Sequence, residues 1–153
     1  MEILPHFWIS YYKNNINLSI VKKKNIKYII HISKNESYLK KNIDVEEIRT
    51  PIDYNDNHNY EEQNNIMYEQ LYDITEYIHN KIINNSNILL LCYEFKQDLE
   101  TIIVAYFIRY GKLNIRDSIL FLKTKKEDIF QPKCLFYCSL NKFYENCLTN
   151  NKI

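Results

Sequence analysis

The chain has 153 residues, of which 46% are hydrophobic, and its 20 basic and 19 acidic side chains leave a formal net charge of +1. This length suits a single domain over residues 1–153, and this apolar content excludes an intrinsically disordered chain. The near-neutral charge excludes a polycation that would neutralise many phosphates, so we expect no nucleic acid among the partners.

Strand-like and helix-like patterns alternate in the first third of the chain. Glu2–Ile9 is short and mixes apolar with aromatic residues, which suits one or two edge strands. Asn14–Lys24 favours a helix. Ile26–Ile32 is rich in β-branched and aromatic residues and is typical of a buried strand, and Val45–Thr50 predicts another. One face of the expected helix carries Ile16, Ile20 and Val21.

The rest of the chain is predicted to be helical around one further strand. Glu61–Ile83 carries Ile and Leu at helical spacing and is typical of a long amphipathic helix. Ile88–Leu91 is a short apolar run that suits a central strand. A strongly apolar helix begins at Asp98, runs to about Arg109 and meets a helix stop at Gly111. The last two expected helices are Ile115–Lys123 and Lys133–Cys147.

This order of elements predicts an α/β domain, with a central twisted sheet of four to five strands flanked by helices. No apolar run approaches the ~20 residues that a bilayer span needs, and no leader pattern opens the chain, so we expect no membrane partner. Asn, Ile, Lys and Tyr dominate the composition. Their codons are AT-rich, which hints at a virus or a parasite.

Cysteine and histidine spacing gives no sign of a metal site. The cysteines form no C-x-x-C pair and match no zinc spacing with histidine, so we expect no metal and no other cofactor. A reduced chain in the cytoplasm follows, in host cytoplasm or a virion if the source is viral. We interpret the histidines as structural or surface residues. The residues concerned are Cys92, Cys134, Cys138, Cys147, His6, His31, His58 and His79.

One segment combines a buried strand, a cysteine at its end, a short loop and a buried helix, over Asn87–Tyr106. Such a turn surrounds the space above Cys92 with backbone N–H groups and a helix N-terminus, which suits an anion. Here the chain resembles the dual-specificity phosphatase family, of the kind also carried by poxviruses. That family reads H-C-x-x-G-x-x-R-S/T, followed by a helix with an Ala-Tyr pair.

Laid over that pattern without a gap, the sequence keeps the nucleophile position as Cys92 and the Ala-Tyr pair as Ala105-Tyr106. The positions of the histidine, glycine, arginine and Ser/Thr fall on Leu91, Phe95, Asp98 and Leu99. Upstream, three segments resemble the family's early strand, its buried strand and the strand that enters its general-acid loop. These segments are Phe7–Ser10, Ile26–Ser33 and Arg49–Tyr54.

The departures from the pattern all oppose the chemistry that the resemblance implies. In such enzymes a thiolate attacks phosphorus, and the arginine holds the phosphate oxygens. Asp98 would repel a phosphate dianion and raise the pKa of the Cys92 thiol. Phe95 stands where the loop must approach the ligand closely. Leu99 has no hydroxyl to donate, and Leu91 cannot orient the loop as a histidine does.

The general-acid loop is also altered. The family places its aspartate three residues after the proline, and from Pro51 that position is Tyr54. Asp53 and Asp56 lie nearby, so the acid could have shifted by a residue or two. An Asn- and Asp-rich stretch such as Tyr54–Tyr60 is also common in plain turns.

The sequence therefore favours a pseudophosphatase, a catalytically inactive phosphatase-like chain that binds or scaffolds protein partners, a homodimer included. Its vestigial phosphate loop holds Leu91, Cys92, Phe95, Lys96, Asp98 and Leu99, and its vestigial acid loop holds Asp53, Tyr54 and Asp56.

Four alternatives stay open. The chain could be a weak cysteine-dependent phosphatase on phosphoprotein or RNA 5′-phosphate, with Lys96 replacing the arginine. Cys92 could perform another chemistry, or be a small buried hydrophobe in an unrelated α/β domain. Asp98 could simply be a helix N-cap.

Overall fold

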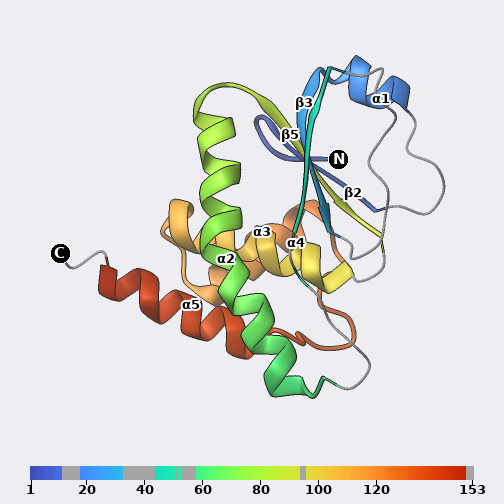
Figure 1. Cartoon of the computed structure of the whole chain (residues 1–153). Coiled ribbons are helices and arrows are strands. Elements are labelled where there is room, and N and C mark those ends of the chain that lie inside the picture. The colour runs from blue at the N-terminus through green and yellow to red at the C-terminus, as the bar shows by residue number, and fades with distance from the viewer. Residues whose placement is uncertain (12–17, 33–43, 51, 53–57, 94–95, 151–153) are drawn as a thin grey trace.

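A computed structural model describes residues 1–11, 18–32, 44–50, 52, 58–93 and 96–150 of the chain. Within these residues, five strands form one sheet in the order β1-β2-β5-β3-β4 (Figure 1). β1 is antiparallel to β2, and the other neighbouring strands are parallel. The strands are β1 Glu2–Leu4, β2 Phe7–Tyr11, β3 Ile26–Ile32, β4 Glu46–Arg49 and β5 Asn87–Cys92. The predicted α/β sheet of four to five strands is confirmed.

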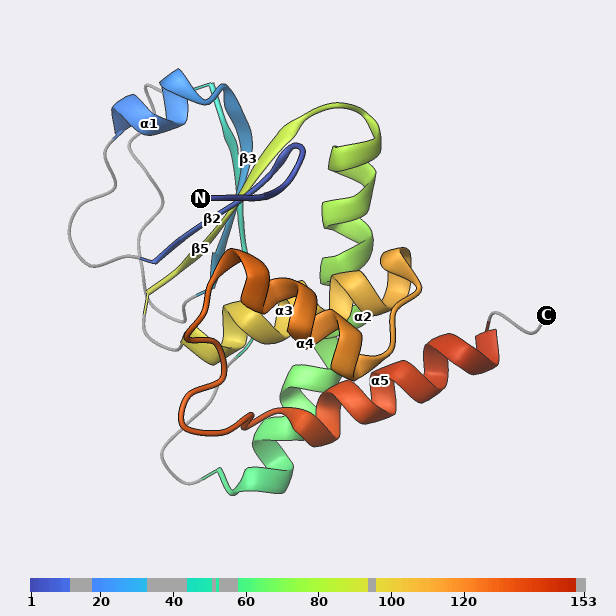
Figure 2. The ribbon, with the colours of Figure 1, turned by 180° about the vertical axis from the view of Figure 1, so that it is seen from behind.

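Helices cover both faces of the sheet, but unequally. One short helix packs on one face, where its Val21 joins Ile29, Leu89 and Leu91 in a small core. The longer helices lie on the other face, and Figure 2 shows α4 and α5 in front of α3. The helices are α1 Leu18–Lys23, α2 Tyr60–Ile83, α3 Lys96–Gly111, α4 Ile115–Lys125 and α5 Tyr137–Asn150.

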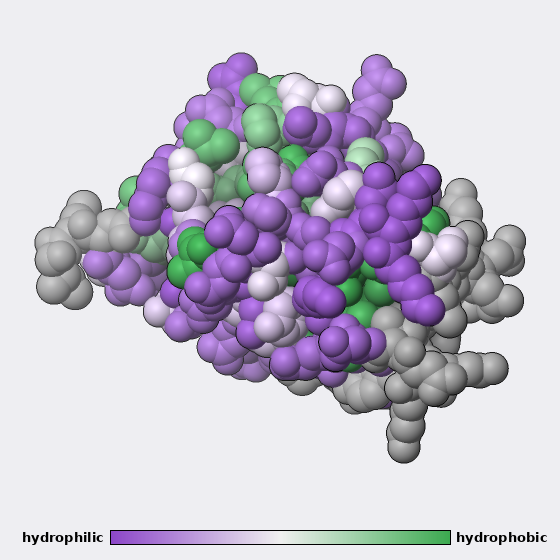
Figure 3. All heavy atoms as spheres, turned by 90° about the horizontal axis from the view of Figure 1, so that it is seen from above, coloured by the Kyte–Doolittle hydropathy of each residue, from purple (hydrophilic) through white to green (hydrophobic). Residues whose placement is uncertain are grey.

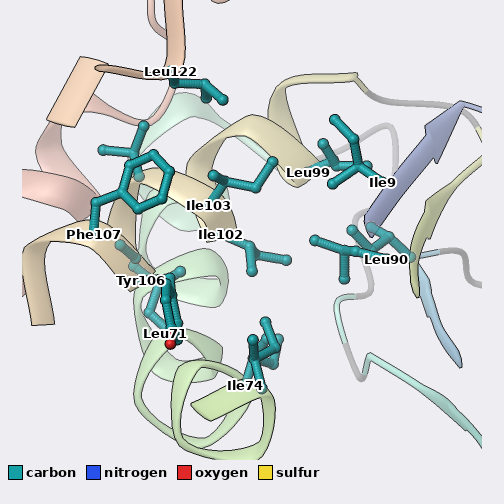
Figure 4. Close-up of a cluster of buried hydrophobic side chains, with 14 of the residues drawn as sticks. Ile9, Leu71, Ile74, Leu90, Leu99, Ile102, Ile103, Tyr106, Phe107 and Leu122 are labelled. Atoms are coloured by element: carbon teal, nitrogen blue, oxygen red, sulfur yellow. The ribbon is translucent and has the colours of Figure 1, made fainter. Parts of the chain in front are cut away.

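Helix α3 is the centre of the larger core. Every residue from Asp98 to Ile108 is buried, because the helix contacts β5 as well as α2, α4 and α5. In Figure 4, Ile102 and Ile103 lie between the sheet residue Leu90 and side chains of the surrounding helices. A helix that is apolar on all sides is stable only when it is enclosed in this way.

Two helices begin at asparagine residues that the sequence supplies in abundance. The Asn59 side-chain oxygen accepts a hydrogen bond from the backbone N–H of Glu62 at 2.8 Å, at the start of α2. Asn114 makes the same 2.8 Å bond to Asp117 at the start of α4. Each bond satisfies a backbone donor that has no partner inside its helix.

Three details of the expected elements are wrong. β2 is not an edge strand, because it pairs with both β1 and β5. Ile20 is exposed while its neighbour Val21 is buried, so the two do not share a buried face of α1. Helix α5 begins at Tyr137, four residues after the expected start.

Helix α3 ends at Gly111, as expected, but Gly111 does not have the left-handed backbone of a typical helix-stop glycine. It is the last residue of the helix, and the left-handed backbone conformation belongs to Lys112, with a φ of 58°. The N–H of Leu113 then bonds back to the carbonyl of Phe107 at 3.4 Å, which closes the helix end. The left-handed position at the helix end is therefore a lysine, where a glycine is more common.

The face seen from above in Figure 3 is mainly hydrophilic, with small, separate hydrophobic patches. Scattered patches of this size are normal on a protein surface. Among the residues described, no helix is both long and apolar enough to cross a membrane.

Candidate functional site: the cysteine loop

The parallel strands β2, β5 and β3 have their carboxyl ends side by side, and Cys92 lies at this end of the sheet. It is the last residue of β5, in register with Tyr11 of β2 and Ile32 of β3. Its side chain is 2% exposed and contributes to the larger core. The predicted position of the cysteine, at the carboxyl end of a central strand and just before a buried helix, is confirmed.

The helix that follows begins at Lys96, so the N-cap role predicted for Asp98 is wrong. Asp98 is the third residue of α3 and lies in its first turn. It is 3% exposed, whereas Lys96 is exposed. A carboxylate in this turn compensates the positive end of the helix dipole, as an external anion would do. The glycine-position residue, Phe95, lies outside the described residues.

The two leucines of the altered signature lie in apolar surroundings. Leu91 joins the small core beneath α1, next to Ile29. Leu99 belongs to the larger core, and Figure 4 shows it pointing toward Ile9 of β2. Both side chains are fully buried. Their places in the fold are explained by packing alone.

Sequence analysis missed a second acid, Glu100, which is 1% exposed beside the loop. One of its oxygens accepts a 2.8 Å hydrogen bond from the backbone N–H of Phe130, and Tyr11 donates to the other at 3.5 Å. The Lys126 ammonium lies 3.9 Å from the same carboxyl group. Burial nevertheless raises the pKa of Glu100 above its usual range. A glutamate inside a strongly apolar helix was the available signal, because glutamate is rarely buried unless paired.

The ring of Tyr11 lies close to two cations. The ammonium groups of Lys126 and Lys96 lie 4.8 and 5.8 Å from the centre of its ring. Burial raises the pKa of Tyr11, and the negative charge of Glu100 adds to the effect. Since Tyr11 is in register with Cys92, both lysines are positioned near the rim of the loop.

A network of buried polar side chains lies at the same end of the sheet, on the side of β3 and β4. His31 of β3 is fully buried, and its Nε2 lies 2.7 Å from a Glu47 oxygen. Its Nδ1 lies 2.9 Å from the hydroxyl of Tyr93, the residue after Cys92. This arrangement confirms a structural role for His31. The partners come from β4 and from the loop, so spacing along the chain could not reveal them.

The predicted acid loop follows strand β4. Asp53, Tyr54 and Asp56 lie outside the described residues. Thr50, just before this segment, is buried, and its backbone N–H donates to the carbonyl of His31 at 3.0 Å. Within the described part of the chain, no cluster of three or more His, Cys, Asp or Glu residues could hold a metal ion.

Comparison with known proteins identifies the scaffold. The family described as "Dual specificity phosphatase, catalytic domain" matches residues 7–146. Human DUSP28 superposes with a TM-score of 0.78 and 12% identity, over 97% of this chain and 98% of that one. The human tyrosine phosphatase-like serine/threonine/tyrosine-interacting protein gives 0.74 and 17%, over 96% of each chain.

A viral protein is similar in sequence over part of its length. Protein 123R of Invertebrate iridescent virus 6, a proposed tyrosine phosphatase, is 30% identical over 77 residues. That match covers 50% of this chain and 54% of the viral protein, so the aligned part is about half of the relative's length. The family match spans nearly the whole domain, and the strand, cysteine and helix lie where that family has them; the chain therefore belongs to the dual-specificity phosphatase family.

Proposed function

We propose that this chain is a pseudophosphatase, a phosphatase-like domain without phosphatase activity that works by binding protein partners. The observation that carries the proposal is the buried Asp98 in the first turn of α3, at the position of the family's arginine. A guanidinium there would grip a phosphate through two parallel hydrogen bonds, and a carboxylate can only repel it.

Two neighbouring features support the same conclusion. Glu100 adds a second buried carboxyl group one turn into the helix, and its pKa, raised by burial, reflects how poorly this place tolerates negative charge. Leu99 fills the core at the position of the hydroxyl that would assist the leaving thiolate. Losing one oxyanion donor costs roughly 10²–10³ in rate, and reversing its charge should cost more.

The protein-binding half of the proposal is supported by an analogy. One structural neighbour is named a tyrosine phosphatase-like interacting protein. Once a phosphatase scaffold has lost its chemistry, its surface is what remains to act. The thiols of Cys134, Cys138 and Cys147 are free, which fits a reducing compartment such as cytoplasm, or host cytoplasm and the virion for a viral chain. Sedimentation velocity would show whether a second copy is itself the partner.

Hydrolysis of an aryl phosphate between pH 5 and 8 tests the loss of activity. We expect the native chain and its Cys92→Ser variant to be equally silent, because neither can stabilise the transition state. Turnover by the native chain that disappears in Cys92→Ser would overturn the proposal. This comparison needs no redesigned loop and does not depend on whether a redesigned loop folds.

A revertant then locates the cause of the loss. We expect the triple change Phe95→Gly, Asp98→Arg and Leu99→Ser to gain vanadate binding, provided that circular dichroism shows a folded chain. Asp98→Asn is a milder companion that removes the charge and keeps the size. A protein partner of the native chain should stay bound in the presence of vanadate, and its displacement would mean that the old pocket still does the binding.

A second candidate function, weak phosphatase activity on phosphoprotein or RNA 5′-phosphate, is favoured by one observation. Lys96 and Lys126 both approach the ring of Tyr11 near Cys92 and could supply positive charge at the rim of the loop. An ammonium lacks the planar fork of arginine, so this replacement would be inefficient. Any activity should then fall in both Lys96→Gln and Lys126→Gln, with Lys123→Gln on α4 as the matched control.

A further inference from the structure

A cavity of about 290 Å³ opens at the other end of α3, between that helix, α2 and α5. The 16 residues of α3 span about 24 Å, so this cavity is well separated from the cysteine loop. Aromatic rings from all three helices line it, namely Tyr68 and Tyr72 of α2, Tyr110 of α3 and Phe143 of α5. Its volume is near the lower end of the ~300–1,000 Å³ range of small-molecule sites, which suits a ligand with one ring.

Part of the wall is a preformed stack of flat groups. The guanidinium carbon of Arg109 lies 3.8 Å from the centre of the Tyr72 ring and 4.8 Å from that of Tyr110. The His79 ring is also stacked on Tyr110, with the two ring centres 3.7 Å apart. Tyr72, at the outer end, is 51% exposed. An additional aromatic ring could therefore extend the stack with little rearrangement.

Arg109 is held firmly in this stack and keeps donors to spare. Its Nη1 donates to the Tyr72 carbonyl at 2.7 Å and to the Thr75 hydroxyl at 3.2 Å. Its Nη2 is 3.8 Å from Glu76, a long contact with a half-exposed carboxylate. A guanidinium has five N–H groups, so these contacts do not exhaust it.

Two cations act on the cysteine in the wall of the cavity. Cys147 of α5 lies in the wall, and burial raises the pKa of its thiol. The two charged groups that act on that thiol are Arg109 and Lys112, and both favour its anionic form. Two carboxylates partly offset these cations, because Glu69 also lines the cavity and Glu76 lies 3.8 Å from Arg109.

We infer that this cavity is a binding site for a single aromatic ring that carries an anionic group, a carboxylate or a phosphate. The ring stacks on the exposed Tyr72, and the anion meets Lys112 and the remaining N–H groups of Arg109. The inference is independent of the proposed function, because no residue of the cysteine loop lines the cavity. The ring could belong to a free metabolite or to a side chain of a partner protein.

Alkylation of Cys147 by neutral iodoacetamide at alkaline pH, followed by mass spectrometry, tests the site in the full-length chain. Cys138, which is exposed and lies outside this cavity, is the internal control. Benzoate and phenylphosphonate are the probes, benzamide has the ring without the charge, and acetate has the charge without the ring. At twice its dissociation constant, a probe should slow the Cys147 reaction about threefold and leave Cys138 unchanged.

A variant without the lysine charge distinguishes recognition of the anion from simple steric blocking of Cys147. Lys112→Asn removes the cation and keeps a residue that tolerates the left-handed backbone found there. It should abolish most of the protection by benzoate, and the matched change Lys123→Asn on α4 should not. Equal protection by benzamide, full protection in Lys112→Asn, or no protection at saturating probe would each overturn the inference.

The source of the ring is decided by a last comparison. A short capped peptide with a central phosphotyrosine is set against phenylphosphonate in the same assay. Tighter binding of the peptide assigns the ring to a protein partner, and tighter binding of phenylphosphonate assigns it to a free metabolite. Both results support the site.

Discussion

The two ends of helix α3 differ in charge and in surroundings. The first turns, beside Cys92, carry Asp98 and Glu100, and both are almost fully buried. The last turn carries Arg109, with Lys112 just beyond it, in an open cavity of tyrosines. Acids at the amino end and bases at the carboxyl end both compensate the partial charges of the helix dipole, which is favourable. At the amino end, we propose that this arrangement replaces the anion site of an active phosphatase.

This difference teaches that the fold and the chemistry of the family are separable. The middle of α3 is fixed by apolar packing, and residues such as Ile102 and Ile103 would serve an active or an inactive enzyme equally well. Cys92 and Asp98 lie at its amino end, and the chemistry of a family resides in such a local site rather than in the fold. Family membership is therefore compatible with the loss of the arginine that we propose.

The largest effect should come from the amino end of α3. Leu99→Ala removes a fully buried side chain, so we expect the free energy of unfolding to fall by about 2–5 kcal/mol. Urea unfolding measures the change. The same substitution at Leu120, which is exposed on α4, is the control and should change it by less than about 0.5 kcal/mol. Equal losses at both positions would mean that this end of α3 is not packed as described.

At the carboxyl end of α3, the expected loss of unfolding free energy is smaller, because the side chain of Arg109 is only partly enclosed. Arg109→Lys removes the flat contact with Tyr72 and at least one of the two Nη1 hydrogen bonds. We expect a loss of about 1 kcal/mol in the same urea assay. Arg116→Lys, exposed on α4, is the matched control and should have little effect. If both variants behave alike, the stack does not stabilise the fold.

The acid at the amino end should make stability depend on pH. Burial raises the pKa of Glu100 in the folded chain, so the folded state holds a proton that the unfolded state has already lost. Stability from this group is therefore largest below the unfolded pKa of about 4.3 and declines as pH rises through the folded pKa. Glu100→Gln should remove this decline and still accept a hydrogen bond from the Phe130 N–H.

Urea unfolding of both chains from pH 4 to pH 8 measures the difference. Glu145→Gln, on the exposed surface of α5, is the matched control and should follow the native chain. A native chain whose stability relative to Glu100→Gln rises with pH in this range would contradict the raised pKa.

The strands and the long helices could be predicted because their side chains repeat with a period. Ile26–Ile32 has the predicted bounds, since its β-branched residues suit a buried strand. Helix α2 begins one residue before the expected start. What the sequence could not predict depends on contacts between distant residues. Glu100 is bonded to Phe130, thirty residues later, and His31 to Glu47 and Tyr93.

The candidate site shows the same contrast between local sequence patterns and contacts of distant residues. The pattern around Cys92 located the loop because strand, turn and helix are adjacent in the chain. The cavity at the other end of α3 was missed because α2, α3 and α5 each contribute only part of it. Tyrosine is also so common in this chain that its clustering carries no signal along the sequence. Only the packing of the helices brings the rings together.

The smallest predicted effect has the opposite sign and concerns the end of α3. A glycine that stops a helix usually has a left-handed backbone, and replacing such a glycine with alanine destabilises the fold. Gly111 has no positive φ here, and a Cβ built on it would lie 3.8 Å from Leu113 Cγ and 3.9 Å from Phe107 Cβ, which is ordinary contact. Gly111→Ala should therefore stabilise the chain by about 0.5–1 kcal/mol.

The neighbouring position provides the matched test. Lys112 has the left-handed conformation, so Lys112→Gly should be neutral or slightly stabilising, whereas Lys112→Ala should be destabilising. Thermal unfolding of the three variants distinguishes the two possible helix ends. If Gly111→Ala is destabilising and Lys112→Ala is neutral, Gly111 rather than Lys112 has the left-handed backbone at the end of α3. The side chain of Lys112 would then reach the cavity from a different direction. This would also change the expected response of the Lys112→Asn variant to benzoate.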